Sequence, residues 1–234
     1  MNYEPDFKNV LEKANELLLQ SNSINDFPFS AYKFTYEMSD AVLMKFSSIE
    51  SDNLTAETIL GTKDASLIEN DGRYLLFYNE KMSRERIRFS VIHENGHYHL
   101  LHDMETVSAG RRNNNQSVES LYSKYEIEAN FFAAQLLMPE QLLIELSRRG
   151  KRITKSFLQE TFLVSEEAAM KRIDTLQKIY NWKTFRNNKY SLNLDDCILL
   201  KFKNFIDRVS PGKISLIEEF ENEEELEKER QSWI

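Results

Sequence analysis

The chain has 234 residues, a formal net charge of -8 and 41% hydrophobic residues. This is enough apolar material to pack the core of one good-sized domain with a small helical appendage. The acidic charge argues against a protein dedicated to nucleic-acid binding, which usually presents a basic face. A single cysteine, Cys197, excludes an internal disulfide framework. The N-terminus shows neither a signal peptide nor a membrane anchor, so we expect a cytoplasmic protein.

The first third of the sequence predicts helices followed by a small sheet. Residues 5–20 carry apolar side chains at helical spacing, and a second helical stretch is expected over about residues 30–46. Two short apolar runs, residues 65–69 and 73–78, flank an Asn-Asp-Gly sequence. An Asp-Gly pair between such runs predicts a hairpin, because a type I′ turn needs positive φ at its centre. We therefore expect a small antiparallel sheet here.

Two longer helices are predicted next, with a polar segment between them. The first covers about residues 83–102, and Ser83 is its expected N-cap. The second covers about residues 122–138 and ends before Pro139. Residues 105–120 are polar and are expected to form a loop. Together these elements predict an α+β domain.

The first of these helices contains the motif His93-Glu94-Asn95-Gly96-His97. Two histidines four residues apart share one face of a helix, so both imidazoles can bind one Zn²⁺ ion. Glu94 lies about 100° around the helix, where it can take a proton from a metal-activated water without binding the metal. Gly96 is costly inside a helix, which indicates a neighbouring element in close contact.

A catalytic zinc site needs a third protein ligand, and the second helix offers two acids. On a helical wheel, Glu128 lies in the middle of the most apolar face, where a buried carboxylate needs a compensating cation. This predicts Glu128 as the third metal ligand. Glu126 falls on a more polar side, as a solvated acid or one that contacts the ligands. Tyr125 is a neighbour of the same kind, and either Tyr122 or Tyr125 is a candidate to stabilise an oxyanion.

The two remaining histidines, His99 and His102, are expected away from the metal. They fall about 240° and 180° around the helix from His93. We therefore expect them on the surface or behind the metal ligands.

Together these blocks resemble the ImmA/IrrE family of metallopeptidases. The resemblance rests on the Arg-x-Arg-Phe block that runs from Arg86 into the HExxH motif, and on the block from Glu126 (Glu-x-Glu-Ala-Asn-x-Phe-Ala) to Met-Pro139. It covers roughly residues 60–140, and Asn95 departs from the apolar residue more usual there. The resemblance implies a gluzincin-like domain, one zinc ion held partly by Glu128, and a helix-turn-helix transcriptional repressor as the protein substrate.

The remainder of the chain is predicted to be mainly helical. Residues 157–176 read as helix, turn, helix, with Ser165 as the cap of the second helix. This segment either recognises DNA or forms a platform that completes the core or docks a protein. Glu166 and Glu167 lie where a recognition helix would face phosphates, which favours the platform.

We divide the chain into a zincin-like metallopeptidase domain at residues 1–139, a helix-turn-helix-like segment at 140–186, and a C-terminal extension at 187–234 with an acidic tail. The predicted function is zinc-dependent cleavage of a repressor that relieves repression. Two alternatives stay open. One is a DNA-binding regulator with a vestigial metal site, and the other is an anti-repressor that binds without cutting.

Overall fold

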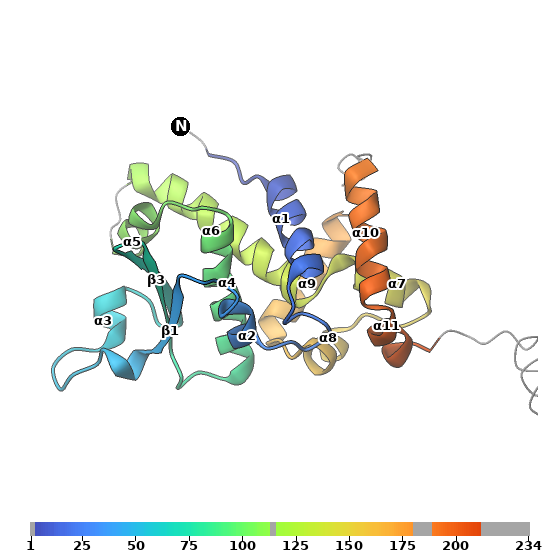
Figure 1. The fold of residues 1–234 in the computed structure, drawn as a ribbon, viewed down its shortest axis with the longest axis horizontal. Helices are drawn as coiled ribbons and strands as arrows, with labels where there is room; N and C mark the ends of the chain where they lie inside the picture. Colours follow the sequence, from blue (N-terminus) through green and yellow to red (C-terminus); the bar gives the residue numbers. More distant parts are fainter. Residues whose placement is uncertain (1–2, 113–115, 180–188, 212–234) are drawn as a thin grey trace, which may run out of the picture.

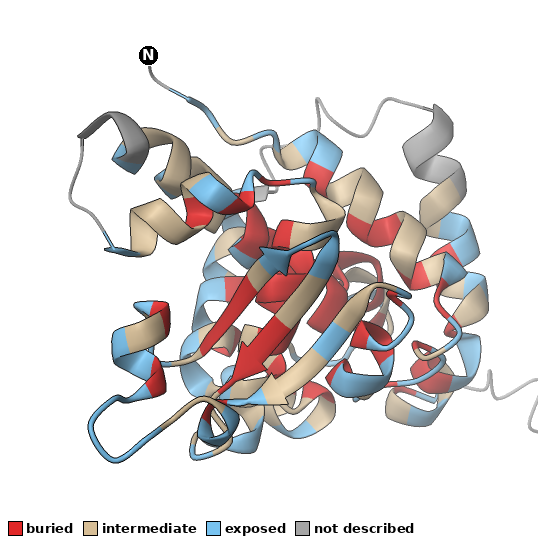
Figure 2. Cartoon of the chain, turned by 60° about the vertical axis from the view of Figure 1, so that its left-hand side comes forward, coloured by how far each residue is buried: buried red, intermediate tan, exposed pale blue. Residues whose placement is uncertain are grey.

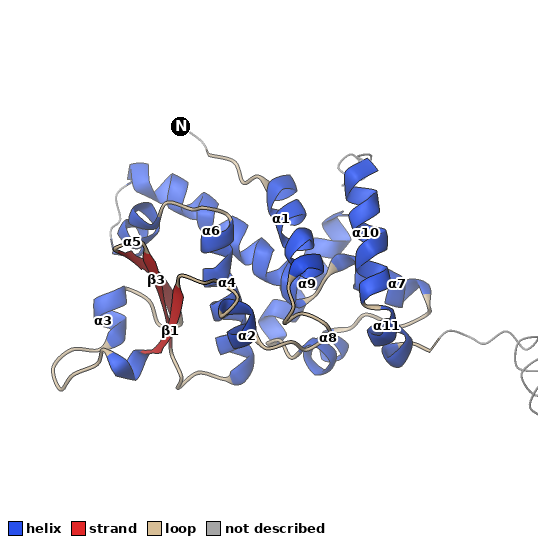
Figure 3. Ribbon diagram, in the orientation of Figure 1, coloured by secondary structure: helices blue, strands red, loops and turns tan. Residues whose placement is uncertain are grey.

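A computed structural model describes residues 3–112, 116–179 and 189–211, which form an α+β fold (Figures 1 and 3). The sheet and its covering helices form one half of the molecule, and the C-terminal helices pack against the other side of α1 and α6. The helices are α1 (Phe7–Gln20), α2 (Ala31–Thr35), α3 (Ala56–Leu60), α4 (Arg84–His99), α5 (Met104–Arg112), α6 (Gln116–Leu137), α7 (Glu140–Arg148), α8 (Lys155–Phe162), α9 (Glu166–Ile179), α10 (Lys189–Lys201) and α11 (Lys203–Val209), with a 3-10 helix at Phe46–Ser48.

The sheet contains three described strands in the order β1-β3-β2: β1 (Ala41–Lys45), β2 (Ala65–Asn70) and β3 (Arg73–Tyr78). Asn70 pairs with Arg73, and both Asp71 and Gly72 have positive φ, 50° and 74°. The predicted Asp-Gly hairpin is thus confirmed. A further strand, β1, runs parallel to β3, so the small sheet expected as antiparallel is mixed. The chain passes through α3 and β2 between β1 and β3, which lets it return in the parallel direction.

Two predicted elements are corrected by the structure. The helical stretch at residues 30–46 is a short helix, α2, followed by strand β1. Pairing of β1 with β3 along its whole length outweighs the helical spacing of its side chains. The polar loop at residues 105–120 holds α5 and the start of α6. Met104 and Val107 are buried on α5, so two apolar contacts were enough to dock a largely polar helix.

Helices α4 and α6 pack closely at the centre of the molecule, where most buried residues lie (Figure 2). Ser83 caps α4, as predicted, by accepting a hydrogen bond from the Arg86 amide. A Cβ on Gly96 would lie 3.2 Å from the Cα of Ala129 and 3.1 Å from the Phe132 ring. This contact explains the glycine, because it lets α6 approach the half of α4 that carries the histidines.

The C-terminal helices are fastened to this core by buried polar side chains. Ser165 caps α9 through the Ala168 amide, so the predicted helix-turn-helix segment forms as α8 and α9. Arg172 on α9 is 1% exposed and donates to the Met138 carbonyl at the end of α6. Lys201 on α10 donates to three carbonyls at the end of α1.

Part of the predicted C-terminal extension lies outside the described residues. Its first helices are α10 and α11, but the acidic tail at residues 218–230 is not among the residues described. Within the described ranges, no helix combines the length and apolar character needed to cross a lipid bilayer.

Candidate metal centre

Two buried histidines on α4 face each other. His93 and His97 are one turn apart, and their Nε2 atoms lie 3.1 Å from each other. His97 is fully buried and His93 is 9% exposed. With Glu94 they form a group whose potential ligand atoms all lie within 4.8 Å. The other ring nitrogens point outward to partners, because His93 Nδ1 contacts Asn130 Oδ1 at 3.2 Å and His97 Nδ1 contacts His102 Nδ1 at 2.9 Å.

The carboxylate of Glu126 completes this arrangement from α6. Its Oε2 lies 3.2 Å from His93 Nε2, and its Oε1 lies 3.4 Å from His97 Nε2. The buried Oε1 atom has no hydrogen-bond donor in the described structure. Burial alone would raise the pKa of Glu126, but its contacts with the two histidines outweigh burial and lower it. Two imidazoles and one carboxylate therefore converge at a point where a cation fits the donor set.

Glu128, the acid expected at the metal, lies elsewhere. It is 5% exposed, but its Oε2 contacts His102 Nε2 at 3.1 Å and its Oε1 accepts the Asp6 amide at 2.6 Å. The contacts thus reverse the order that the helical wheel gave to Glu128 and Glu126. The wheel identified the face of α6 with large apolar residues as the face toward the metal. In the structure, α4 approaches α6 through small residues, Gly96 and Ala129, which leaves space for the more polar Glu126 side.

Two tyrosines of α6, Tyr122 and Tyr125, lie near Glu126 and Glu128. Tyr125 stacks on His102 with a centroid distance of 4.2 Å, so it contacts the ring that binds Glu128. Burial, and then the charge of Glu126, raises the pKa of Tyr122, which keeps its hydroxyl protonated and able to donate. Its hydroxyl is hydrogen-bonded to Arg111 and Glu126, so of the two tyrosines Tyr122 is the one that contacts the acid beside the histidine pair. His99 packs between Phe34 and Phe132 and takes no part in the site.

Glu94 is held between a strand and an arginine. Its Oε2 accepts the Leu67 amide of β2 at 2.7 Å, and its Oε1 accepts from Arg111 Nη2 at 2.7 Å. Burial would raise the pKa of Glu94, but Arg111 and the histidines lower it, so the carboxylate is ionised. The ionised form is the one that can accept a proton, and Glu94 presents it beside the histidine pair, while Arg111 lowers its basicity.

The sequence analysis missed Arg111 because it placed this residue in a polar loop. Its side chain is 6% exposed, its Nη1 donates to Ser66 Oγ at 2.8 Å, and its Nη2 lies 3.9 Å from Glu126. Helix α5 carries it into the site. The available signal was the pair Met104 and Val107, whose spacing fits one buried helix face.

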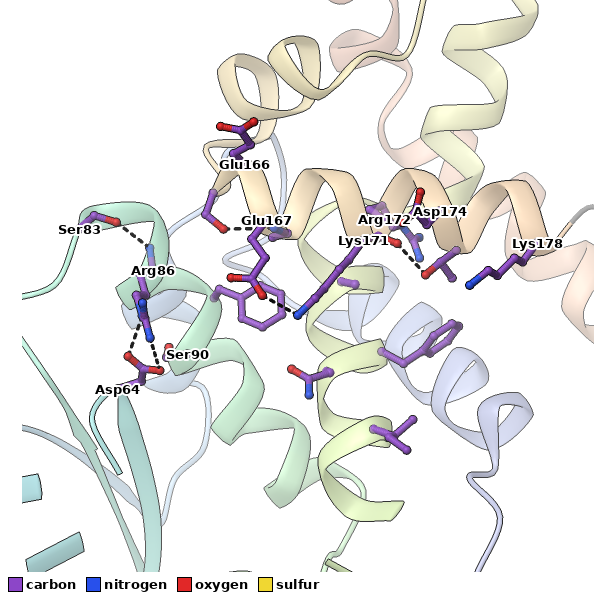
Figure 4. Close-up of a pocket in the computed structure, with 18 of the residues that line it drawn as sticks. Asp64, Ser83, Arg86, Ser90, Glu166, Glu167, Lys171, Arg172, Asp174 and Lys178 are labelled. Carbon is purple, nitrogen blue, oxygen red and sulfur yellow. Dashed lines mark hydrogen bonds and ion pairs between the residues drawn. The ribbon is translucent and has the colours of Figure 1, made fainter. Parts of the chain in front are cut away.

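A groove of about 900 Å³ lies next to the centre, between α4, α6 and α9 (Figure 4). Asn130 lines it and also contacts His93, so the groove and the histidine pair share a wall. Its apolar lining includes Phe89, Ile127 and Phe131. Figure 4 shows α9 crossing α4 and α6, with Glu167 and Lys171 paired above the groove.

Residues 51–174, more than half of the chain, match the family model described as the IrrE N-terminal-like domain of the M78 peptidases. The match begins after β1, includes β2 and β3, and continues past residue 139 into α9. A comparison with curated proteins returned no match.

Proposed function

This chain belongs to the IrrE N-terminal-like family of peptidases, and we propose that it is a zinc-dependent endopeptidase whose metal is held by His93, His97 and Glu126. The observation that carries the proposal is the convergence of two imidazole Nε2 atoms and the carboxylate of Glu126, whose buried Oε1 has no hydrogen-bond partner among the residues described. Two nitrogen ligands and one oxygen ligand, with one position left for water, are typical of catalytic zinc.

The residues around the site can perform peptide hydrolysis. Bound zinc would polarise the scissile carbonyl and activate a water. Glu94 then accepts a proton from the attacking water and delivers it to the leaving amine. Leu67 and Arg111 hold the Glu94 carboxylate in place for this transfer. The protonated hydroxyl of Tyr122 is the donor that we assign to the oxyanion.

The substrate that we propose is a protein, and specifically a helix-turn-helix repressor whose cleavage relieves repression. The repressor follows from the family resemblance of the sequence. The groove beside His93 supports a polypeptide substrate, because it offers an apolar floor and a polar rim along three helices. The buried anchor of α9, Arg172, favours the role of α9 as a wall of this groove over a role in DNA recognition.

Metal analysis and cleavage together test this function. Purified protein should contain about one zinc ion per chain, and His97→Ala should lose it. Glu126→Gln should weaken zinc binding, whereas Glu119→Gln, which removes an exposed acid on the same helix, should not. A peptide library derived from a bacterial proteome should be cut by the zinc-loaded wild type alone. Full zinc retention in His97→Ala, or no cut peptide with loaded enzyme, would contradict the proposal.

A further inference from the structure

Three buried side chains form a hydrogen-bonded chain that ends at the metal centre. Glu128 Oε2 lies 3.1 Å from His102 Nε2, and His102 Nδ1 lies 2.9 Å from His97 Nδ1. The other ring nitrogen of His97, Nε2, faces His93 and Glu126. The exposed fractions of the three residues are 5%, 7% and 0%, so water does not compete for these contacts.

The chemistry of the groups fixes the direction in which each proton points. The Asp6 amide and the Lys124 ammonium, 3.7 Å away, both face Glu128 Oε1, which suits the ionised carboxylate. An ionised carboxylate only accepts, so His102 Nε2 must donate to it. A neutral imidazole carries one N–H, which leaves His102 Nδ1 as an acceptor.

The last link of the chain determines the state of His97. Since His102 Nδ1 accepts, His97 Nδ1 must carry a proton and donate it. A neutral His97 then has its lone pair on Nε2, which faces Glu126 and His93. This is the tautomer in which Nε2 can bind a metal. The opposite direction would place a proton on His97 Nε2 and prevent it from acting as a ligand.

We propose that Glu128 and His102 are positioning residues that hold His97 in its metal-binding tautomer and orientation. This Glu128–His102–His97 relay rests on the proposed zinc site. Outer partners of this kind orient metal-binding histidines and make the ligand more basic. Asn130 performs the same task for His93 in a single step, since its Oδ1 contacts His93 Nδ1 directly.

Two contacts keep the relay in place. Tyr125 stacks on the His102 ring with an interplanar angle of 14°. The Asp6 amide, immediately before α1, binds the second oxygen of Glu128 at 2.6 Å. The relay therefore explains why Glu128 is buried on an apolar face although it does not reach the metal centre.

The zinc affinity of the protein, measured by chelator competition, tests the relay separately from the proposed metal site. His102→Phe keeps a ring beside Tyr125 but removes both nitrogens, and it should weaken zinc binding about 10- to 100-fold. His102→Asn places an amide oxygen near the position of Nδ1 and should restore affinity to within about threefold of wild type. Glu128→Leu should weaken zinc about 10-fold, and Glu128→Gln less, because glutamine still accepts.

His99→Phe is the matched control, because it removes a histidine of the same helix that packs among aromatic rings. Its zinc affinity should equal that of wild type. If His102→Phe binds zinc as tightly as His99→Phe does, the relay is overturned. Loss of zinc in His97→Ala would still support the metal centre in that case, so the two failures can be told apart.

A second measurement uses the wild-type protein and so does not depend on whether a variant folds. Nitrogen-15 NMR of histidine-labelled wild type with zinc should show His102 protonated at Nε2 and His97 protonated at Nδ1. His102 protonated at Nδ1 would reverse the relay and overturn the proposal.

Discussion

Helix α6 takes part in two buried polar clusters, and the two differ in how their groups are paired. At the C-terminal end of α6, donors and acceptors alternate. Gln135 Nε2 donates to Asn15 and Gln141, while its Oε1 accepts from Arg172 at 2.5 Å. We call these four residues the C-terminal polar network. It joins α1, α6, α7 and α9, and its bonds hold the helices together.

The proposed metal centre of His93, His97 and Glu126 is built differently. Four atoms, the Nε2 atoms of the two histidines and both carboxylate oxygens of Glu126, are joined by contacts of 3.1 to 3.4 Å, and one of them, Glu126 Oε1, has no hydrogen-bond partner within the described ranges. Buried acceptors that share no donor repel one another and have lost their hydration. A cation bound among these atoms would remove that repulsion. In the first cluster the buried atom that lacks a partner in the described structure is a donor, Arg172 Nη1, whereas in the second it is an acceptor, Glu126 Oε1, and an unpartnered acceptor is the kind that a cation can satisfy.

Buried arginines show the same contrast. Arg88 and Arg172 donate to backbone carbonyls, at Phe162 and Met138 among others. Arg111 donates to the side chains of Glu94 and Ser66. The first two complete helix ends and loops, while the third holds Glu94, the proposed general base. Substitutions in the two regions should therefore have separable effects on stability and on activity.

The largest effect is expected for Glu94→Gln. Glutamine keeps the shape of Glu94 but cannot take a proton from water, so peptide cleavage should fall by about 10²- to 10⁴-fold. Zinc content should stay at the wild-type level, because Glu94 bonds to Leu67 and Arg111 and is not one of the three ligands. Turnover of a peptide substrate and metal analysis check both statements. Cleavage at the wild-type rate would remove Glu94 from the mechanism.

Arg111→Met should lower turnover by about 10²-fold, since it removes the charge that holds Glu94. Arg112→Met is the matched control, because Arg112 is exposed and donates to the Ile59 carbonyl outside the site. Zinc affinity should change little in either variant. A more active Arg111→Met protein would show instead that Arg111 blocks the site.

Arg172→Met should act on stability and leave zinc affinity unchanged. It would leave Gln135 Oε1 and the Met138 carbonyl without their donor in a buried region, which should lower the free energy of unfolding by about 3 kcal/mol. Denaturant unfolding of the apo protein measures this. A loss of zinc affinity without loss of stability would mean that the two regions are coupled and that their separation is wrong.

The smallest effect is expected for substitutions in the groove. The groove connects the proposed metal centre with the C-terminal polar network, because α9 forms one of its walls and also contains Arg172. Thr175→Trp fills the groove and should raise KM for a protein substrate about 10-fold, with little change for a short peptide. Met170→Trp, at an exposed position of the same helix outside the groove, is the control. Equal KM values for both variants would place the substrate elsewhere.

The sequence predicted the parts of the site that depend on one helix. The spacing of His93 and His97 and the cap at Ser83 are local, and the structure places all three on α4 as expected. The choice between Glu126 and Glu128 depends on which face of α6 meets α4. That face is set by the close contact at Gly96, which a wheel of apolar residues does not show.

The remaining features depend on contacts between distant segments. Arg111 reaches Glu94 only because α5 docks on β2, and β1 becomes a strand only because β3 lies beside it. The Asp71-Gly72 hairpin was predictable because the turn geometry is contained in the two residues themselves.

The most direct test of the account is a crystal structure of the zinc-loaded protein with anomalous data collected at the zinc edge. The account predicts one strong peak bonded to His93 Nε2, His97 Nε2 and a Glu126 oxygen at about 2.0 to 2.2 Å, with Glu128 still paired to His102. A peak bonded to Glu128, or no peak between the two histidines, would contradict it.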